Sequence, residues 1–276
     1  TSTLYEQAIY LIEGRQFQVD RLDFERRKAY VRPVDSDYFT DAITHTKVTI
    51  LETFDSVVQP PSMVSAGTLD ESDASVRDPV LAEARGCHGE VHVVSRVVGF
   101  KKIKFYTNEN VGSGELDLPE QEMHTTAYWL TIPRVLVESL PYAGDGRRDG
   151  IVGLGSALRQ VAQLLLMCDR HDIGLAIHGE EVGSQDQPTV FIYDNYPGGI
   201  GFSEPLFTLH GPLLAQTRAL IERCPCAVGC PACVGPIGQT GPLAKTVALS
   251  LLLALDVESE AVTPGSSWAF SPLDEE

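Results

Sequence analysis

The sequence predicts an α+β fold, in which a β-rich, barrel-like N-terminal half precedes a helix-rich half with a few strands. Up to Pro133, apolar residues come in short alternating runs divided by turn residues, which is typical of antiparallel strands. Beyond Pro133 they recur every three or four residues, as on the buried face of a helix. We therefore expect a β-rich subdomain over residues 1–133, a helix-rich subdomain over residues 134–255 and an acidic tail over residues 256–276.

The β-rich half begins with three short strands, because turn signals such as Glu13–Gly14 divide its apolar runs. Residues 55–87 are rich in Pro, Ser, Asp and Glu and lack periodicity, which predicts a mobile insertion. Residues 109–122 predict a loop. Strands are expected at residues 8–14, 15–23, 28–34, 46–53, 90–107 and 124–132.

The second half should be built around a long buried helix over residues 150–169. Its apolar positions, among them Ile151, Leu154 and Leu158, repeat at helical spacing. The remaining expected elements are a short helix at 134–140, strands at 173–179 and 189–195, a helix at 202–222 interrupted near Gly211–Pro212, and a last helix at 242–255.

The chain of 276 residues carries a formal net charge of −17. A broad nucleic-acid-binding face needs a surplus of Lys and Arg to neutralise phosphates, so this balance leaves room only for a local basic patch. The apolar run 247–255 is too short to span a bilayer, and the first residues lack the regions of a signal peptide. We expect a cytoplasmic protein, and because it begins at Thr1, a fragment of a longer polypeptide.

Four of the six cysteines crowd into CPCAVGCPACVGP, residues 224–236. Thiolates are preferred ligands of Zn²⁺, and Gly and Pro allow and stiffen the tight turns that bring such ligands together. The spacing favours a four-sulfur metal site, which has no open position and is therefore structural. The same ligands also suit an iron–sulfur cluster, so that alternative stays open. The expected ligands are Cys224, Cys226, Cys230 and Cys233.

Basic and aromatic residues interleave in RVVGFKKIKF, residues 96–105. Such a surface can follow a nucleic-acid backbone and stack on bases, or it can be the solvated face of an ordinary strand. The candidate nucleic-acid contacts are Arg96, Lys101, Lys102 and Lys104.

Other motifs carry weaker signals, and no catalytic residue is predicted. The Gly-rich turn at 193–204 is either a phosphate cradle or a sharp turn from strand to helix. The segment 238–246 fails the spacing of a phosphate-binding loop at Lys245. His171, His178 and His210 are either satisfied or exposed side chains, or they supply a fifth metal ligand or a general base.

Four blocks in this order resemble the C-terminal region of the MrfA/YprA-type DEAD/DEAH-box helicases of superfamily two. They are residues 8–42, 97–130, 193–204 and 224–236. The resemblance implies a bacterial DNA-repair helicase that uses ATP to move 3′→5′ along single-stranded DNA, with its ATP and Mg²⁺ sites upstream of this region. It also implies that the four clustered cysteines bind zinc. Ile12 and Ser156 stand where family members often have His.

We expect a zinc-binding accessory domain that supports the helicase motor domains of the same polypeptide, guides the strand and has no chemistry of its own. Two alternatives remain open. The chain is a free-standing, metal-stabilised interaction partner that acts in trans, or it is an iron–sulfur redox or sensor module.

Overall fold

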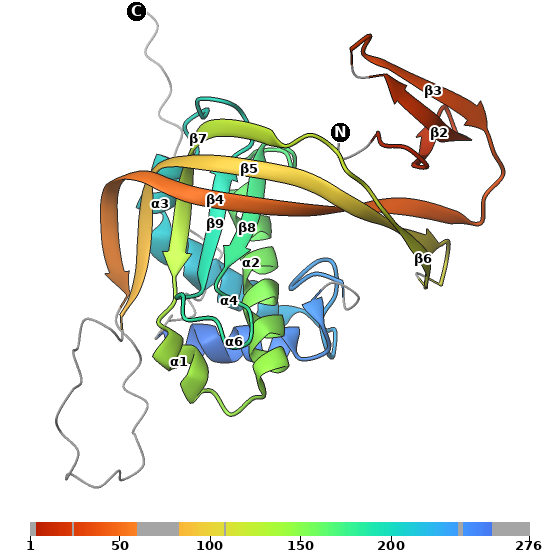
Figure 1. Cartoon of the computed structure of the whole chain (residues 1–276). Helices are drawn as coiled ribbons and strands as arrows, with labels where there is room; N and C mark the ends of the chain where they lie inside the picture. Colours follow the sequence, from red (N-terminus) through yellow and green to blue (C-terminus); the bar gives the residue numbers. More distant parts are fainter. Residues whose placement is uncertain (1–3, 24, 60–82, 108, 237–239, 256–276) are drawn as a thin grey trace, which may run out of the picture.

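The computed structural model describes residues 4–23, 25–59, 83–107, 109–236 and 240–255. Figure 1 shows a small sheet at one end, a long curved sheet across the middle and helices packed on one side of that sheet. This arrangement confirms the α+β class, with a β-rich, barrel-like N-terminal half and a helix-rich half that contributes further strands.

The small sheet contains the first three strands in the order β1-β2-β3, and all its pairings are antiparallel. Its strands are β1 (Ile9–Ile12), β2 (Arg15–Asp23) and β3 (Lys28–Pro33). The predicted turn at Glu13–Gly14 is confirmed, since both residues have the left-handed backbone that a tight hairpin needs, with φ of 49° and 75°. Val19 of β2 and Tyr5 are buried with Phe100, and these contacts attach the small sheet to the long one.

The second sheet has the order β4-β5-β7-β9-β8, and β6 pairs with β5 beyond the end of β7. All neighbours in it are antiparallel. Its strands are β4 (Tyr38–Gln59), β5 (Ala84–Lys104), β6 (Asn110–Glu115), β7 (Gln121–Thr131), β8 (Ile173–His178) and β9 (Thr189–Asp194).

Two expectations for this sheet were wrong in part. β4 and β5 both extend into the segment 55–87, which was expected to be an insertion; residues 60–82 of that segment lie outside the described residues. The long pairing between the two strands supplies backbone hydrogen bonds that side-chain periodicity does not reveal. Similarly, β6 forms inside the expected loop 109–122, because β5 extends past β7 and offers a free edge.

The second sheet curls until its first and last strands approach each other. The backbone N–H of Val48 in β4 donates to Nε2 of His178 in β8 at 3.2 Å. The curl encloses a cluster of apolar side chains that includes Trp129 and Phe191. β8 and β9 come from the second half of the chain, so one sheet unites both halves; the division into subdomains at residue 133 stays a prediction.

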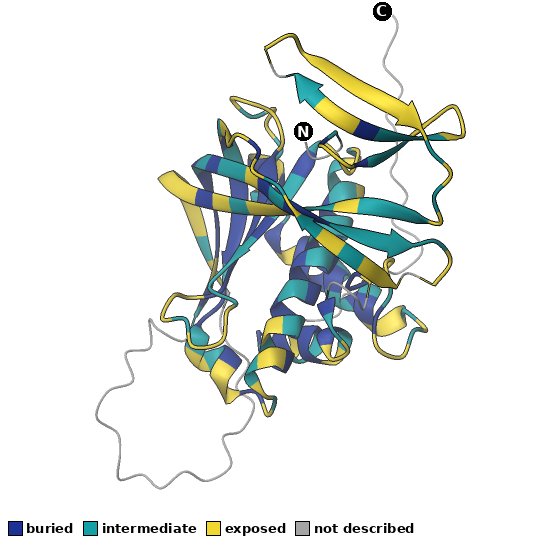
Figure 2. Cartoon of the chain, turned by 45° about the vertical axis from the view of Figure 1, so that its right-hand side comes forward, coloured by how far each residue is buried: buried dark blue, intermediate teal, exposed yellow. Residues whose placement is uncertain are grey.

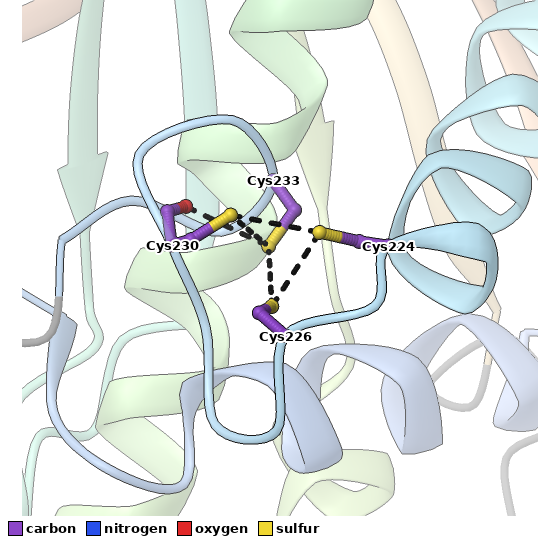
Figure 3. Close-up of side chains that lie close together, drawn as sticks. All are labelled: Cys224, Cys226, Cys230 and Cys233. Carbon is purple, nitrogen blue, oxygen red and sulfur yellow. Dashed lines mark hydrogen bonds between the residues drawn. The ribbon is translucent and has the colours of Figure 1, made fainter.

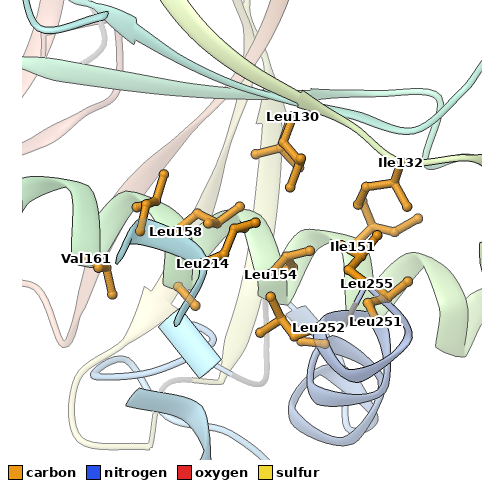
Figure 4. Close-up of a cluster of buried hydrophobic side chains, with 14 of the residues drawn as sticks. Leu130, Ile132, Ile151, Leu154, Leu158, Val161, Leu214, Leu251, Leu252 and Leu255 are labelled. Carbon is orange, nitrogen blue, oxygen red and sulfur yellow. The ribbon is translucent and has the colours of Figure 1, made fainter. Parts of the chain in front are cut away.

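Helices cover the outer face of this sheet and enclose the main core (Figure 4). Because successive strand residues point to opposite faces, Leu130 of β7 faces the helices while Trp129 faces the curled interior. The predicted helix over 202–222 is interrupted at Leu209, just before Gly211–Pro212. The helices are α1 (Arg134–Ser139), α2 (Gly144–Leu166), α3 (Ser203–Thr208), α4 (His210–Arg223) and α6 (Ala244–Ala254).

The helix α2 begins at Gly144 rather than at 150, and its glycines let α6 approach closely. A Cβ atom added at Gly150 would lie 2.2 Å from Cγ1 of Val247, so any larger residue would push the two helices apart. Figure 2 shows that the faces shared by these helices are buried. Of the helices in the described ranges, none has the length and apolar character needed to cross a membrane.

Candidate metal centre

The cysteine loop begins where α4 ends. Cys224 caps this helix, and its backbone N–H donates to the carbonyl of Leu220 at 3.2 Å. Further along, the N–H groups of Cys233 and Gly235 both donate to the carbonyl of Cys230, at 3.0 and 3.1 Å, which closes a tight turn. Gly229 has a φ of 138°, a backbone conformation that favours glycine. The helix end and the two turns together direct the four cysteine side chains inward.

The four sulfur atoms form a compact group (Figure 3). All four lie within 4.8 Å of one another. The separations are 3.5 Å for Cys224–Cys226, Cys224–Cys230 and Cys226–Cys233, and 3.6 Å for Cys230–Cys233. These distances are too long for disulfide bonds. Four sulfurs around one Zn²⁺, each about 2.3 Å from the ion, would lie slightly less than about 4 Å apart. The group therefore fits a single four-coordinate ion.

The thiols of this group differ in their environments. A hydrogen bond from the backbone N–H of Cys226 lowers the pKa of the Cys224 thiol to about 7, assisted by the neighbouring thiols. Burial raises the pKa of the Cys233 thiol to about 12. Because thiolates are the ligand form, a bound cation must displace protons from the group, and the cost is greatest at Cys233.

Two side chains from other helices hold the loop. Lys245 of α6 donates from Nζ to the carbonyls of Cys224 and Cys226, at 2.7 and 2.5 Å. Gln160 of α2 donates from Nε2 to the carbonyl of Cys233 at 2.8 Å. The loop is thus attached to three helices, and a positive charge lies beside four potential thiolates. Helical periodicity does not reveal these two contacts, because nothing in it marks a polar residue as a loop contact.

The loop also packs on the main core. Cys233 and Val234 are fully buried within it, and the other three cysteines are half-buried against it. A disturbance at the sulfurs would therefore reach the packing of α2, α4 and α6.

In the Gly-rich turn at 193–204, the backbone N–H groups bind a carboxylate of the chain itself. The Oδ2 atom of buried Asp194 accepts from the backbone N–H groups of Ile200 and Gly201, at 2.7 and 2.9 Å, and from the hydroxyl of Thr126 at 3.1 Å. A carboxylate of the chain itself fills the place that a phosphate would need. This supports the interpretation of the segment as a sharp turn from strand to helix.

The histidines singled out by sequence lie apart from one another. His178 bridges β4 and β8, and burial lowers its pKa. The Nδ1 atom of buried His210 lies 2.8 Å from the hydroxyl of Tyr128 in β7. His171 is exposed and pairs with Asp169 at 2.7 Å. Within the described ranges, the one group of three or more metal-binding side chains is formed by the four cysteines alone.

The basic residues on β5 have partners of their own. Arg96 lies 2.6 Å from Asp117, and Lys104 lies 3.9 Å from Asp37. Lys102 lies over the ring of Tyr38, with Nζ 5.5 Å from the ring centroid. Lys101 stands opposite Asp41 in the β4–β5 pairing. The structure thus places the four residues on one strand, and carboxylates already compensate part of their charge.

The α+β fold and the four-cysteine loop define a class of domain with a candidate four-sulfur metal site, and the comparison with known families agrees. Residues 154–234 match the family model described as the MrfA Zn-binding domain.

The particular relatives are helicases. The chain is 36% identical over 227 residues to the uncharacterized ATP-dependent helicase YprA of Bacillus subtilis (strain 168), an alignment that covers 82% of this chain and 27% of YprA. A crystal structure of the DUF1998 helicase MrfA bound to DNA has 34% identity and a TM-score of 0.56, over 92% of this chain and 30% of that one. A second MrfA crystal structure has 29% identity and a TM-score of 0.54, over 91% of this chain and 30% of that one.

These matches confirm the resemblance given by the sequence. The chain is related to a part of the MrfA/YprA-type helicases, and it spans between 27% and 30% of the length of these relatives.

Proposed function

We propose that this chain is the zinc-binding accessory part of an ATP-dependent 3′→5′ DNA helicase of DNA repair, with a structural and strand-guiding role and no catalysis of its own. The observation that carries the proposal is the group of four thiols within 4.8 Å of one another, on a loop attached to three helices. The match to the MrfA Zn-binding domain and the helicase relatives support it.

The residues of the chain indicate a structural site. Four thiolates complete the coordination of one zinc ion, which then crosslinks the loop and has no open position for a substrate. Lys245 offsets part of the negative charge of the thiolates, while Gln160 and the core around Val234 fix the loop on α2. The described side chains that donate hydrogen bonds to the cysteine loop lie on helices of the chain itself.

ATP and Mg²⁺ belong, in this proposal, to motor domains of the same polypeptide, and those domains are the main protein partner. MrfA has been crystallised with DNA, which supports single-stranded DNA as the second partner. The strand-guiding residues predicted by sequence, Arg96, Lys101, Lys102 and Lys104, remain candidates for that contact. A cytoplasmic location follows from the same assignment.

An iron–sulfur cluster is the competing assignment for the site. A cluster of several irons between the cysteines would push their sulfurs further apart than the 3.5 to 3.6 Å separations seen here. The geometry therefore favours a single ion over a cluster.

The experiment that tests the proposal measures metal content and stability together. The purified protein should contain about one zinc per chain. Cys230→Ser should lose most of the zinc and lower the midpoint of thermal unfolding strongly, since metal binding can contribute on the order of 10 kcal/mol to such a local fold. Cys87→Ser, which alters a buried cysteine of the curled interior, is the control and should keep the zinc.

Stoichiometric iron with visible absorbance would refute the zinc assignment. A Cys230→Ser protein that lacks zinc but unfolds like the parent would refute the structural role.

A further inference from the structure

Positive charge is concentrated in two short parts of this acidic chain: residues 96–104 hold four Lys and Arg and no Asp or Glu, and a second basic part lies in the small sheet. Residues 15–33, which include β2 and β3, contain six Lys and Arg against three Asp and Glu, a local charge of +3 in a chain of −17. The rest of the protein therefore carries −20. An anionic partner would be repelled by most of the molecule and attracted here.

Several of these cations have no carboxylate partner. Arg15, Arg27 and Lys28 form no ion pair with any described residue, whereas Arg32 pairs with Asp20 at 2.9 Å. Arg21 instead stacks on Tyr30, with its guanidinium carbon 4.5 Å from the ring centroid. The charge of these side chains is available to a ligand, in contrast to the paired Arg96 and Lys104 on β5.

These residues lie on an open sheet. Every residue of β3 is exposed, and Tyr30 keeps 41% of its surface accessible (Figure 2). A β-bulge after Val19 sets Arg21 directly across from Tyr30, while Arg32 stands across from Gln18, so these partners share a face. The opposite face is anchored through buried Val19. The outer face thus offers an aromatic ring, a glutamine amide and free cations on a fixed support.

We propose that the outer face of β2 and β3 binds a single strand of nucleic acid, with Tyr30 stacking on a base and the nearby cations contacting phosphates. An exposed ring prefers the face of an unpaired base, because bases of a duplex already stack on each other. Lys28 stands on the same face of β3 as Tyr30 and Arg32, because side chains alternate along a strand, and Arg27 lies in the turn just before it, so the cations flank the ring. The inference deepens the strand-guiding part of the proposed function and is independent of the zinc loop.

The test measures binding of fluorescein-labelled oligo(dT) by fluorescence anisotropy over a series of salt concentrations. Tyr30→Ala should weaken binding about tenfold, and Tyr30→Phe should keep the affinity, because the ring that stacks is retained. Arg27→Gln with Lys28→Gln should weaken binding and reduce the steepness of its salt dependence by about 1.4, at ~0.7 for each phosphate that is no longer neutralised. The matched control is Arg148→Gln with Arg170→Gln, which removes the same charge from exposed positions in and just after α2 and should change the affinity at most twofold.

Unchanged affinity in Tyr30→Ala and in the Arg27 and Lys28 double variant would overturn the proposal. An equal loss in the Arg148 and Arg170 control would also overturn it, because net charge alone would then explain the binding. No binding by the parent would overturn it as well and leave the face to a protein partner. Zinc content measured in every sample keeps the two proposals separate. If strand binding persists after complete loss of zinc and of helix stability, the nucleic-acid surface is supported and the zinc role gains no support. If the zinc-loaded parent binds no strand, the zinc role is supported and the nucleic-acid surface is refuted.

Discussion

Lys245 joins a helix to the cysteine loop through a single ammonium group. Its two hydrogen bonds go to carbonyls of Cys224 and Cys226, residues whose sulfurs belong to the four-thiol group. A cation in this position does two things: it fixes the backbone that aims the thiols, and it lowers the electrostatic cost of gathering four thiolates. Both effects act on metal affinity.

Replacing Lys245 should therefore weaken zinc binding. We expect Lys245→Met to lower the zinc affinity by about 10- to 100-fold, the usual effect of losing a residue that supports a metal ligand. Competition with a chromophoric zinc chelator measures this affinity.

Arg223→Met is the control for this prediction, since Arg223 precedes Cys224 but its side chain is exposed. Equal losses in the two variants would mean that only overall charge matters. Unchanged affinity in Lys245→Met would remove Lys245 from the site.

At the scale of elements, the contact between α2 and α6 depends on glycine. Gly150→Ala would place a Cβ atom 2.2 Å from Cγ1 of Val247 and 3.2 Å from its carbonyl carbon, so backbone as well as side chain must move. We expect a loss of about 1–3 kcal/mol in the free energy of unfolding, despite the better helix propensity of alanine. Urea denaturation measures it.

Gly211→Ala is the matched control, because it lies on α4 and a Cβ atom there would meet nothing within 4 Å beyond its neighbours in the chain. This variant should lose less stability than Gly150→Ala, because the new Cβ atom meets only the ring of the following Pro212. If both substitutions have the same effect, close approach of the helices is not what Gly150 provides.

His210 joins another pair of elements, α4 and β7, through its contact with Tyr128. Burial lowers the pKa of His210 to about 4, below the ordinary value of about 6.5. At a pH between these two pKa values, His210 binds a proton in the unfolded chain but not in the folded chain, so the free energy of unfolding falls as the pH drops. We expect this residue to cost about 2 kcal/mol of stability between pH 7 and pH 5.

The comparison of parent and His210→Gln by urea denaturation at the two pH values isolates this effect from the titration of the cysteines. The variant should lose about 2 kcal/mol less than the parent on acidification. His171→Gln, at an exposed position, should behave as the parent does. An identical pH dependence in the parent and in His210→Gln would contradict the buried neutral state of His210.

At the scale of the whole molecule, the proposal that ATP binds to separate motor domains predicts no ATP hydrolysis by this chain. The segment 238–246 lacks phosphate-loop spacing, and Lys245 already donates to two carbonyls. DNA-stimulated phosphate release by the pure protein should stay at background. Turnover that disappears on substitution of a residue within this chain would refute the prediction.

Sequence reasoning was most successful where the signal is local. The hairpin at Glu13–Gly14, the break near Gly211–Pro212 and the buried face of α2 all follow from residue types within one or two turns of chain. The four cysteines were found in the same way, because ten consecutive residues supply every candidate ligand. Spacing alone is sufficient when a site is built within one loop.

What the sequence determined by itself was thus the order of elements apart from β6, the α+β class and the candidate metal ligands. Only the tertiary structure decided that β4 and β5 continue into segment 55–87, that Asp194 fills its own glycine turn, and that Gln160 and Lys245 reach the cysteine loop. The reason is physical: hydrogen bonds between distant backbone groups, and polar side chains that satisfy carbonyls on other elements, leave no periodic trace in a sequence. They exist only after packing has brought the partners together.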